Sequence, residues 1–217
     1  MIAAALIWSF VWPKRRRDGY VALAMIAGLY AVLALPVVAA SLAGRLIAPV
    51  LADAEIREIQ ILFVFGGDNE LGRIREAQRI CRLAQPQAIW LLDAAYMRDD
   101  LRMVGVPLSR IHIDASTWNT QSQIDRVVEV LRGSPGARAA ILASRLQAPR
   151  IALLTAYAGA EIPVAPSPLD RALPSAGPRS LMPSYAALLT SRDAIYENVA
   201  LAYYRARRPG SRDGARR

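Results

Sequence analysis

The sequence has little of the chemistry that usually carries catalysis or covalent cross-linking. Among 217 residues there is one cysteine, Cys81, one histidine, His112, and one lysine, Lys14. A single cysteine excludes an internal disulfide. A single histidine excludes His-rich metal sites and makes any Ser-His-Asp or Cys-His scheme depend on His112. Because His112 lies inside an expected strand with no nucleophile or carboxylate spaced to work with it, we expect it to be structural.

Positive charge is abundant but unevenly spread. The formal net charge is +9, and residues 1–53 and 205–217 carry +3 and +5 of it. Residues 54–204 hold 16 arginines against 15 acidic side chains, so the expected folded core is nearly neutral. We find no basic groove interleaved with aromatic side chains, the feature that single-stranded nucleic acid requires. We therefore expect no nucleic-acid partner, and the basic ends suit anionic lipid.

An uncharged segment lies near the N-terminus, over residues 19–44. It is long enough to cross a bilayer, which needs roughly 20 apolar residues, and a proline such as Pro36 is tolerated in such a span. An earlier apolar run, residues 2–12, is only about half that length. The competing interpretation is a cleaved signal peptide with a processing site within residues 39–43. The length of the apolar core and the run upstream favour a retained anchor.

These features predict three parts. Residues 1–53 form a membrane anchor, made of the short apolar segment 2–12, the basic loop 14–18 and the span at about 19–44. Residues 54–204 form one folded domain, and residues 205–217 form a basic, disordered tail. The basic loop should remain cytoplasmic by the positive-inside rule. The expected location is thus a bacterial inner (plasma) membrane, with the domain on the periplasmic side and the lipid bilayer as a partner.

Residues 54–204 alternate between short apolar runs and segments with helical periodicity. The expected strands are 61–65, 88–92, 110–113 and 139–143, with a short fifth strand at 162–164. The expected helices are 71–83, 96–104, 121–131, 149–157 and 185–204, and residues 165–183 are expected to form an irregular loop. This alternation predicts an α/β fold, a Rossmann-like parallel sheet flanked by helices, preceded by one or two transmembrane helices.

Each of the four clear strands ends in glycine or polar residues. In a parallel sheet these ends converge on one edge, where open α/β folds bind ligands. Glycine lets a ligand approach the backbone, and Arg73 and Arg150 follow strands one and four closely enough to neutralise a phosphate. Three strand-end aspartates, Asp68, Asp93 and Asp114, are also compatible with a cation, but turns and helix caps commonly contain aspartate. We expect no metal and no cofactor.

The ordered set of motifs resembles the YdcF/SanA/ElyC-like family of largely membrane-associated bacterial α/β domains. The motifs are Gly66-Gly67, Arg73 with Glu76, Gly105-Val106-Pro107, Thr117-x-Asn119-Thr120, Ser144-x-x-Gln147-x-x-Arg150 and Tyr196-Glu197. They cover roughly residues 58–204, and the leading anchor is similar to the ElyC branch. The resemblance implies an envelope protein of cell-wall (peptidoglycan) or polyprenyl-carrier metabolism that binds an anionic, phosphate-bearing ligand.

The chain departs from the family pattern at several positions. Leu92-Asp93-Ala94 stands where the family has a glycine pair, and Gln147 stands where it has histidine. Thr117 replaces the usual serine, with Ser116 as the alternative match. Glutamine forms hydrogen bonds but cannot act as a general base, so ligand binding is implied more firmly than acid–base catalysis. A non-catalytic scaffold and a nucleotide-type cofactor binder remain the alternatives.

The residues expected to contact the ligand come from the strand ends and from the family motifs. They are Gly66, Gly67, Asp68, Asn69, Arg73, Asp93, Ser116, Thr117, Asn119, Thr120, Ser144, Gln147, Arg150 and Glu197.

Overall fold

The computed structural model describes residues 16–46, 48–67, 70–168 and 177–207. Contacts divide the chain into two units. The first contains Met1–Arg45 with Arg171–Ile195, and the second contains Leu46–Asp170 with Tyr196–Arg217. Helix α9 (Tyr185–Ala206) therefore begins in the first unit and ends in the second. Each unit is described separately below.

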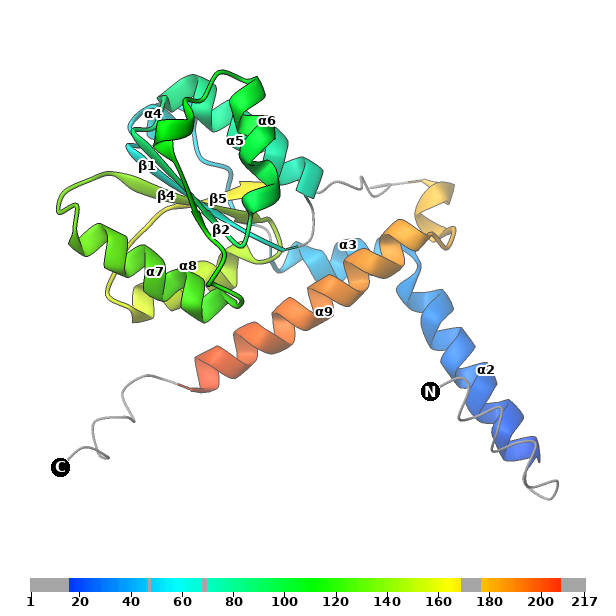
Figure 1. The fold of residues 1–217 in the computed structure, drawn as a ribbon. Coiled ribbons are helices and arrows are strands. Elements are labelled where there is room, and N and C mark those ends of the chain that lie inside the picture. The colour runs from blue at the N-terminus through cyan, green and yellow to red at the C-terminus, as the bar shows by residue number, and fades with distance from the viewer. Residues whose placement is uncertain (1–15, 47, 68–69, 169–176, 208–217) are drawn as a thin grey trace, which may run out of the picture. The chain divides into compact units, whose positions relative to one another are not determined.

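The second unit is an α/β sandwich around a five-stranded sheet (Figure 1). Its strands are β1 (Ile61–Phe65), β2 (Ala88–Leu92), β3 (Ile111–Asp114), β4 (Ala139–Ser144) and β5 (Val164–Ser167). The strand order is β3-β2-β1-β4-β5 and all pairs are parallel, with Phe63 beside both Trp90 and Ile141. This confirms the expected α/β fold with a parallel sheet flanked by helices.

Strand β1 is buried on both faces because it lies at the centre of the sheet. Its continuous apolar sequence is the pattern expected of a strand covered by helices on both sides. Leu62 and Val64 pack in one core, and Ile61, Phe63 and Phe65 pack in the other. Each fully buried side chain of this size contributes about 1.5–3 kcal/mol of transfer free energy.

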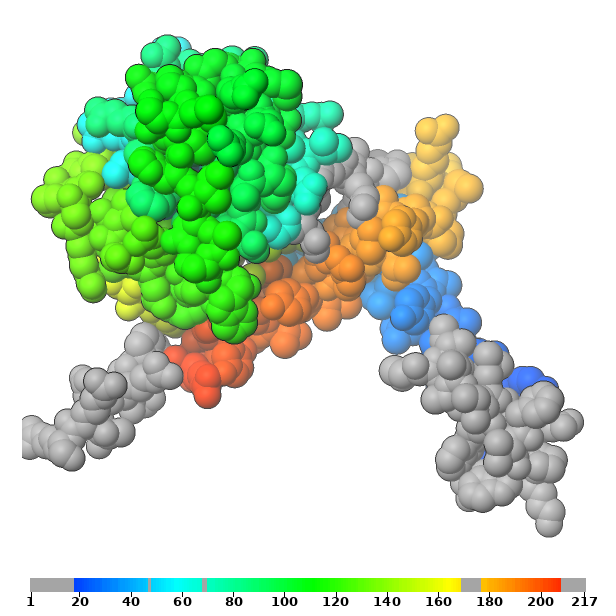
Figure 2. Space-filling view, in the orientation of Figure 1, coloured from blue at the N-terminus to red at the C-terminus, as the bar shows by residue number. Residues whose placement is uncertain are grey.

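Helices cover the two faces of the sheet as separate layers. Helices α4 (Asp53–Arg57), α5 (Glu70–Ala84) and α6 (Arg98–Met103) contribute to the core that contains Leu62. Helices α7 (Thr120–Arg132) and α8 (Ala148–Tyr157) contribute to the core that contains Phe63. Figure 2 shows the closely packed atoms of this unit, with green atoms from the middle of the chain over most of the face in view.

Short 3-10 helices complete the connections: η2 (Ala95–Met97) precedes α6, η3 (Leu108–Arg110) precedes β3, and η4 (Pro178–Leu181) precedes α9. A fifth strand was expected and is present, but its bounds were wrong, since β5 spans Val164–Ser167 and not 162–164. Residues 165–183, expected to form an irregular loop, contain most of β5 and all of η4. Pro166 concealed this strand in the sequence. A proline is accommodated there because β5 is an edge strand paired only with β4.

The first unit contains α2 (Arg16–Leu33) and α3 (Pro36–Gly44), with η4 and the start of α9. The expected continuous span over residues 19–44 is instead two helices separated at Pro36, which occupies the first turn of α3. No single described helix has both the length and the apolar character needed to cross a membrane. Together α2 and α3 satisfy these criteria as a pair bent by 68°. Residues 2–12 and 208–217 lie outside the described residues.

Cys81 in α5 provides a test of this core. Its side chain is buried, and burial raises the pKa of the thiol to about 12. Because the thiolate is the reactive form, a maleimide or disulfide reagent at pH 8 should modify native protein only through opening of the fold. We expect labelling at least about 100-fold slower in native than in urea-unfolded protein. Equal labelling rates in the two states would contradict this packing of α5.

Candidate functional site

A polar cavity of about 460 Å³ lies at the carboxyl edge of the sheet, within the second unit. Its position follows the strand order, because β1 and β4 are neighbours whose following helices lie on opposite faces. Ligands of open α/β sheets bind at such a switch point. The residues lining the cavity are Gly66, Gly67, Asp93, Trp118, Asn119, Thr120, Gln121, Gln123, Gln147, Arg150, Tyr196 and Tyr204.

Gly66 lets the ends of β1 and β2 approach closely. Its amide donates to the Leu92 carbonyl over 2.7 Å, so this N–H serves the sheet. A Cβ atom on Gly66 would lie 2.0 Å from the backbone oxygen of Asp93, a distance that no side chain tolerates. Gly67 follows with φ of +119°, in a region that favours glycine. The glycine pair is therefore required by backbone geometry.

The side chain of Arg73 holds this loop by hydrogen bonds to its backbone. The side chain is completely buried in α5, its Nη1 donates to the Phe65 carbonyl over 3.1 Å, and its Nη2 donates to the Gly67 carbonyl. Both acceptors are neutral, Nε has no hydrogen-bond partner, and no carboxylate pairs with Arg73 among the described residues. Arg73 thus places a buried positive charge behind Gly67 instead of extending into the cavity.

The phenol of Tyr96 in η2 interacts with the guanidinium of Arg73. Burial raises the pKa of the Tyr96 phenol, while the charge of Arg73 and a hydrogen bond to it oppose the rise. Sequence analysis missed Tyr96, because nothing in the spacing relates η2 to α5.

Asp93 has an unusual backbone conformation at the end of β2. Its φ is +54°, in the left-handed region that non-glycine residues rarely adopt and that aspartate tolerates better than most. Its amide donates to the Asp114 carbonyl over 3.1 Å, and its exposed side chain lines the cavity. The family pattern has glycine at this position, where a left-handed conformation has no steric cost.

The loop after β3 is held by local hydrogen bonds. Asp114 accepts from the Ser116 amide and hydroxyl over 2.9 and 2.5 Å, and it pairs with Arg126 over 3.0 Å. The bonds from Ser116 lower the pKa of Asp114 most, and Arg126 adds to the effect against a smaller opposing contribution from burial. The hydroxyl of buried Thr117 donates to the Asp114 carbonyl over 3.2 Å. Neither Ser116 nor Thr117 lines the cavity.

Asn119 begins α7. Its side-chain oxygen accepts a hydrogen bond from the Ser122 amide over 2.8 Å, and its own amide donates to the Ser122 hydroxyl over 3.2 Å. Such a reciprocal cap stabilises the start of a helix. This cap directs the first turn of α7, with Thr120 and Gln121, toward the cavity. The partial positive charge of the helix N-terminus therefore faces the site.

Arg150 of α8 is held by α9. Its Nε and Nη2 donate to the two carboxylate oxygens of buried Glu197 over 2.7 and 2.8 Å, and Nη1 donates to the Thr120 hydroxyl over 2.8 Å. Burial acts to lower the pKa of Arg150, but the hydrogen bond and charge attraction of Glu197 raise it overall. Its guanidinium also lies 5.9 Å from the centre of the Tyr196 ring. Arg150 joins three elements and carries a neutralised charge.

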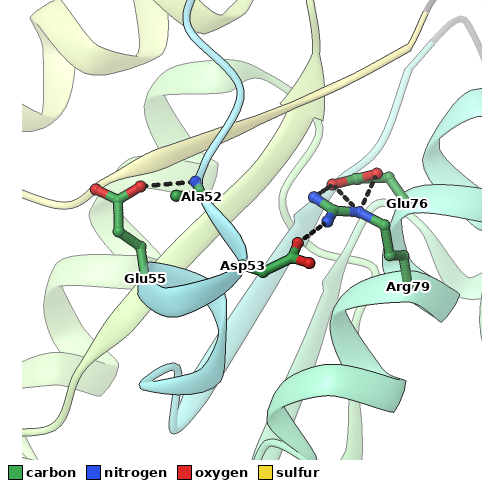
Figure 3. A network of polar contacts seen from close by, with 5 residues as sticks. All are labelled: Ala52, Asp53, Glu55, Glu76 and Arg79. Atoms are coloured by element: carbon green, nitrogen blue, oxygen red, sulfur yellow. Dashed lines mark hydrogen bonds and ion pairs between the residues drawn. The ribbon is translucent and has the colours of Figure 1, made fainter.

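The remaining expected residues differ in their positions. Gln147 lines the cavity near Gly67, whose added Cβ would lie 3.4 Å from its Nε2. Ser144 is buried at the end of β4 and is not among the lining residues. Glu76 belongs to a salt-bridge network with Arg79 and Asp53 (Figure 3), and it is not among the lining residues. Asp68 and Asn69 lie outside the described residues.

The expected contacts also left out five lining residues: Trp118, Gln121, Gln123, Tyr196 and Tyr204. Gln123 is buried and donates from Nε2 to the Leu92 carbonyl over 3.2 Å, which ties α7 to the end of β2. A glutamine beside Ile124 on the apolar face of α7 was the available signal for it. Tyr196 stands beside Glu197 in one of the family motifs, whereas Tyr204 reaches the site only because α9 packs beside it, which no local pattern reveals.

His112 lies in β3 with its side chain exposed. Its ring stacks on Trp90 with centroids 4.6 Å apart, and the Arg126 guanidinium lies 4.8 Å from the Trp90 ring centre. His112 is not among the residues that line the cavity. Across the described part of the chain, no group of three His, Cys, Asp or Glu side chains is placed to hold a metal ion.

Comparisons with protein-family models, with curated proteins and with solved structures found no match to this chain. The resemblance to the YdcF/SanA/ElyC-like family therefore rests on the residues described above and on their order along the chain.

The contact between Gly66 and Asp93 predicts a steric effect on stability. Gly66→Ala should lower the free energy of unfolding by roughly 2 kcal/mol or more, because the methyl group collides with backbone that cannot move aside. Gly133→Ala is the matched control, since φ there is −77° and the nearest atom is 3.4 Å from the added Cβ. Urea denaturation followed by circular dichroism measures both. Equal losses in the two variants would contradict the close approach.

The pair formed by Arg150 and Glu197 predicts non-additive changes in stability. Glu197→Gln leaves a buried guanidinium without a counter-charge and should cost about 3–5 kcal/mol. The exposed pair of Arg138 and Glu58 is the control, and Glu58→Gln should cost no more than about 1 kcal/mol. In a double-mutant cycle, Arg150→Met with Glu197→Leu should be less destabilising than the sum of these two single changes. Strict additivity of the single changes would show that the pair contributes no coupling.

Proposed function

We propose that this chain is an envelope protein of the YdcF/SanA/ElyC-like type that binds a phosphate-bearing ligand in the cavity at the carboxyl edge of its sheet. The bent pair of α2 and α3 attaches it to the plasma membrane of a bacterium. The basic residues 14–17 then lie on the cytoplasmic side, which puts the α/β unit on the periplasmic side by the positive-inside rule.

The observation that carries this proposal is the buried charge of Arg73. Among the described residues Arg73 has no carboxylate partner, and a charge without one is costly to bury, since its attraction to solvent is lost. The guanidinium lies directly behind Gly67, which lines the cavity, and its acceptors are two carbonyl groups. An anion bound above Gly67 would offset the cost of burying Arg73.

The N-termini of two helices also favour a negatively charged ligand. Helix α7 presents its first turn to the cavity and α8 begins directly after Gln147, so two positive helix ends converge there. Helix N-termini are common binding sites for phosphate groups. Exposed Trp118 and Tyr196 supply apolar surface beside this polar centre, which suits a phosphate attached to an organic group. A lipid-linked phosphate of cell-wall or polyprenyl-carrier metabolism has this composition.

Binding without catalysis is the second candidate, and Gln147 favours it. This residue occupies the cavity position where the family pattern has histidine, and its amide cannot accept a proton as a general base. Among the described residues, Arg150 and Asp93 are the charged side chains of the cavity lining, and Arg150 is paired with Glu197. A phosphate-release assay separates binding from hydrolysis.

The proposal predicts that detergent-solubilised full-length protein binds inorganic pyrophosphate or a polyprenyl phosphate. Arg73→Lys should weaken binding at least about tenfold, which corresponds to about 1.4 kcal/mol, because a lysine cannot hold both carbonyls and keep its charge behind Gly67. Arg79→Lys is the matched control, since Arg79 lies in the same helix but pairs with Asp53 and Glu76.

Isothermal titration calorimetry measures the affinities, and circular dichroism verifies that both variants are folded. Wild-type protein that binds neither ligand would overturn the proposed function. Equal weakening by Arg73→Lys and Arg79→Lys would remove Arg73 as its basis.

A further inference from the structure

The break between α2 and α3 leaves two backbone carbonyls without their helical donors. In a continuous helix the amides of Val37 and Val38 would donate to them, but the chain bends at Pro36 and the Val38 amide donates to Leu35 instead. The two carbonyls without helical donors are those of Leu33 and Ala34. In a membrane-associated helix such groups need partners, because lipid offers no hydrogen bonds.

Residues from the other end of the chain satisfy both carbonyls. The Ser191 hydroxyl donates to the Leu33 oxygen over 2.7 Å, and the Ser184 amide donates to the Ala34 oxygen over 2.8 Å. Both donors lie at the start of α9 or directly before it, in the same unit as the bent pair (Figure 1). The bend is therefore closed by a defined contact within that unit.

The segment that closes the bend resembles the bent pair in composition. Residues 177–191 contain one charged side chain, Arg179, and no carboxylate, while residues 19–44 contain no charged side chain. Both segments expose large apolar side chains. Leu181, Met182 and Tyr185 are 64%, 63% and 70% exposed, and Met25 and Leu29 of α2 are 66% and 58% exposed.

We propose that residues 178–185, formed by η4 and the start of α9, are a second membrane-contacting element that enters the bilayer interface beside the bent pair. This inference rests on the proposed membrane attachment. Leu181 and Met182 would face the acyl chains, and Tyr185 suits the headgroup level, where aromatic side chains gather. Arg179 can extend toward lipid phosphates.

The bilayer explains this surface better than a water-filled setting does. Three large exposed apolar side chains lie within five residues, in a segment whose η4 contacts α3, and such a patch marks a protein or membrane contact. The hydrogen bonds of Ser184 and Ser191 fix this patch to the helices that the proposal already places in lipid. The occupant of one surface should therefore also cover the other.

Three exposed methionines permit a matched test. Full-length protein is prepared with Met182→Cys, with Met25→Cys in α2 or with Met103→Cys in α6, each labelled with the fluorophore NBD. Cys81 is buried and is not expected to label, so wild-type protein measures background. Each sample is reconstituted in vesicles of phosphatidylcholine and phosphatidylglycerol, with or without nitroxide-labelled phosphatidylcholine, and quenching is measured.

We expect the labels at positions 25 and 182 to be quenched, and the label at position 103, which is 75% exposed in the α/β unit, to be unaffected. Quenching at 182 should be strongest with nitroxides near the headgroup, because the element is interfacial. Quenching at 25 without quenching at 182 overturns this inference and leaves the membrane attachment intact. No quenching at either position overturns both this inference and the membrane attachment. A label at 182 that is shielded from lipid and from aqueous iodide indicates a protein partner and also overturns this inference.

Discussion

The carboxyl edge of the sheet depends on one buried cation. Arg73 reaches from α5 to the carbonyls of Phe65 and Gly67, so the loop that ends β1 is fixed by a side chain of the helix that follows it. The loop that Arg73 holds contains Gly67 with φ of +119° and follows the close approach of Gly66 to Asp93. The same guanidinium pairs with no carboxylate among the described residues, and the proposed anion site rests on that charge.

A second buried arginine has the opposite character. Arg150 is neutralised by Glu197 and bonded to Thr120, so it joins α7, α8 and α9 without contributing net charge. Sequence analysis expected both arginines to neutralise a phosphate, but the two side chains have different surroundings in the structure. Arg73 provides the field behind the loop, while Arg150 fixes the position of the wall formed by the later helices.

Much of the sheet could be predicted because its signals are local. Apolar runs gave the bounds of β1 and β2 correctly, and helical periodicity located α5, α7 and α8 to within one residue at each end. β5 was misplaced because Pro166 is acceptable only on an edge strand, and edge position is a property of the whole sheet. For the site, the glycine pair, Asp93, Asn119, Thr120, Gln147 and Arg150 were expected and line the cavity.

The sequence alone determined the alternation of strands and helices, the long uncharged segment and the neutral charge of the region between the basic ends. These features depend on neighbouring residues and on composition. Only the tertiary structure decided that Arg73 lies behind its loop, that Glu197 cancels Arg150, and that Ser184 and Ser191 close the bend at Pro36. Each is a contact between groups on different elements, several of them distant in sequence, and the spacing of residues along one element carries no information about it.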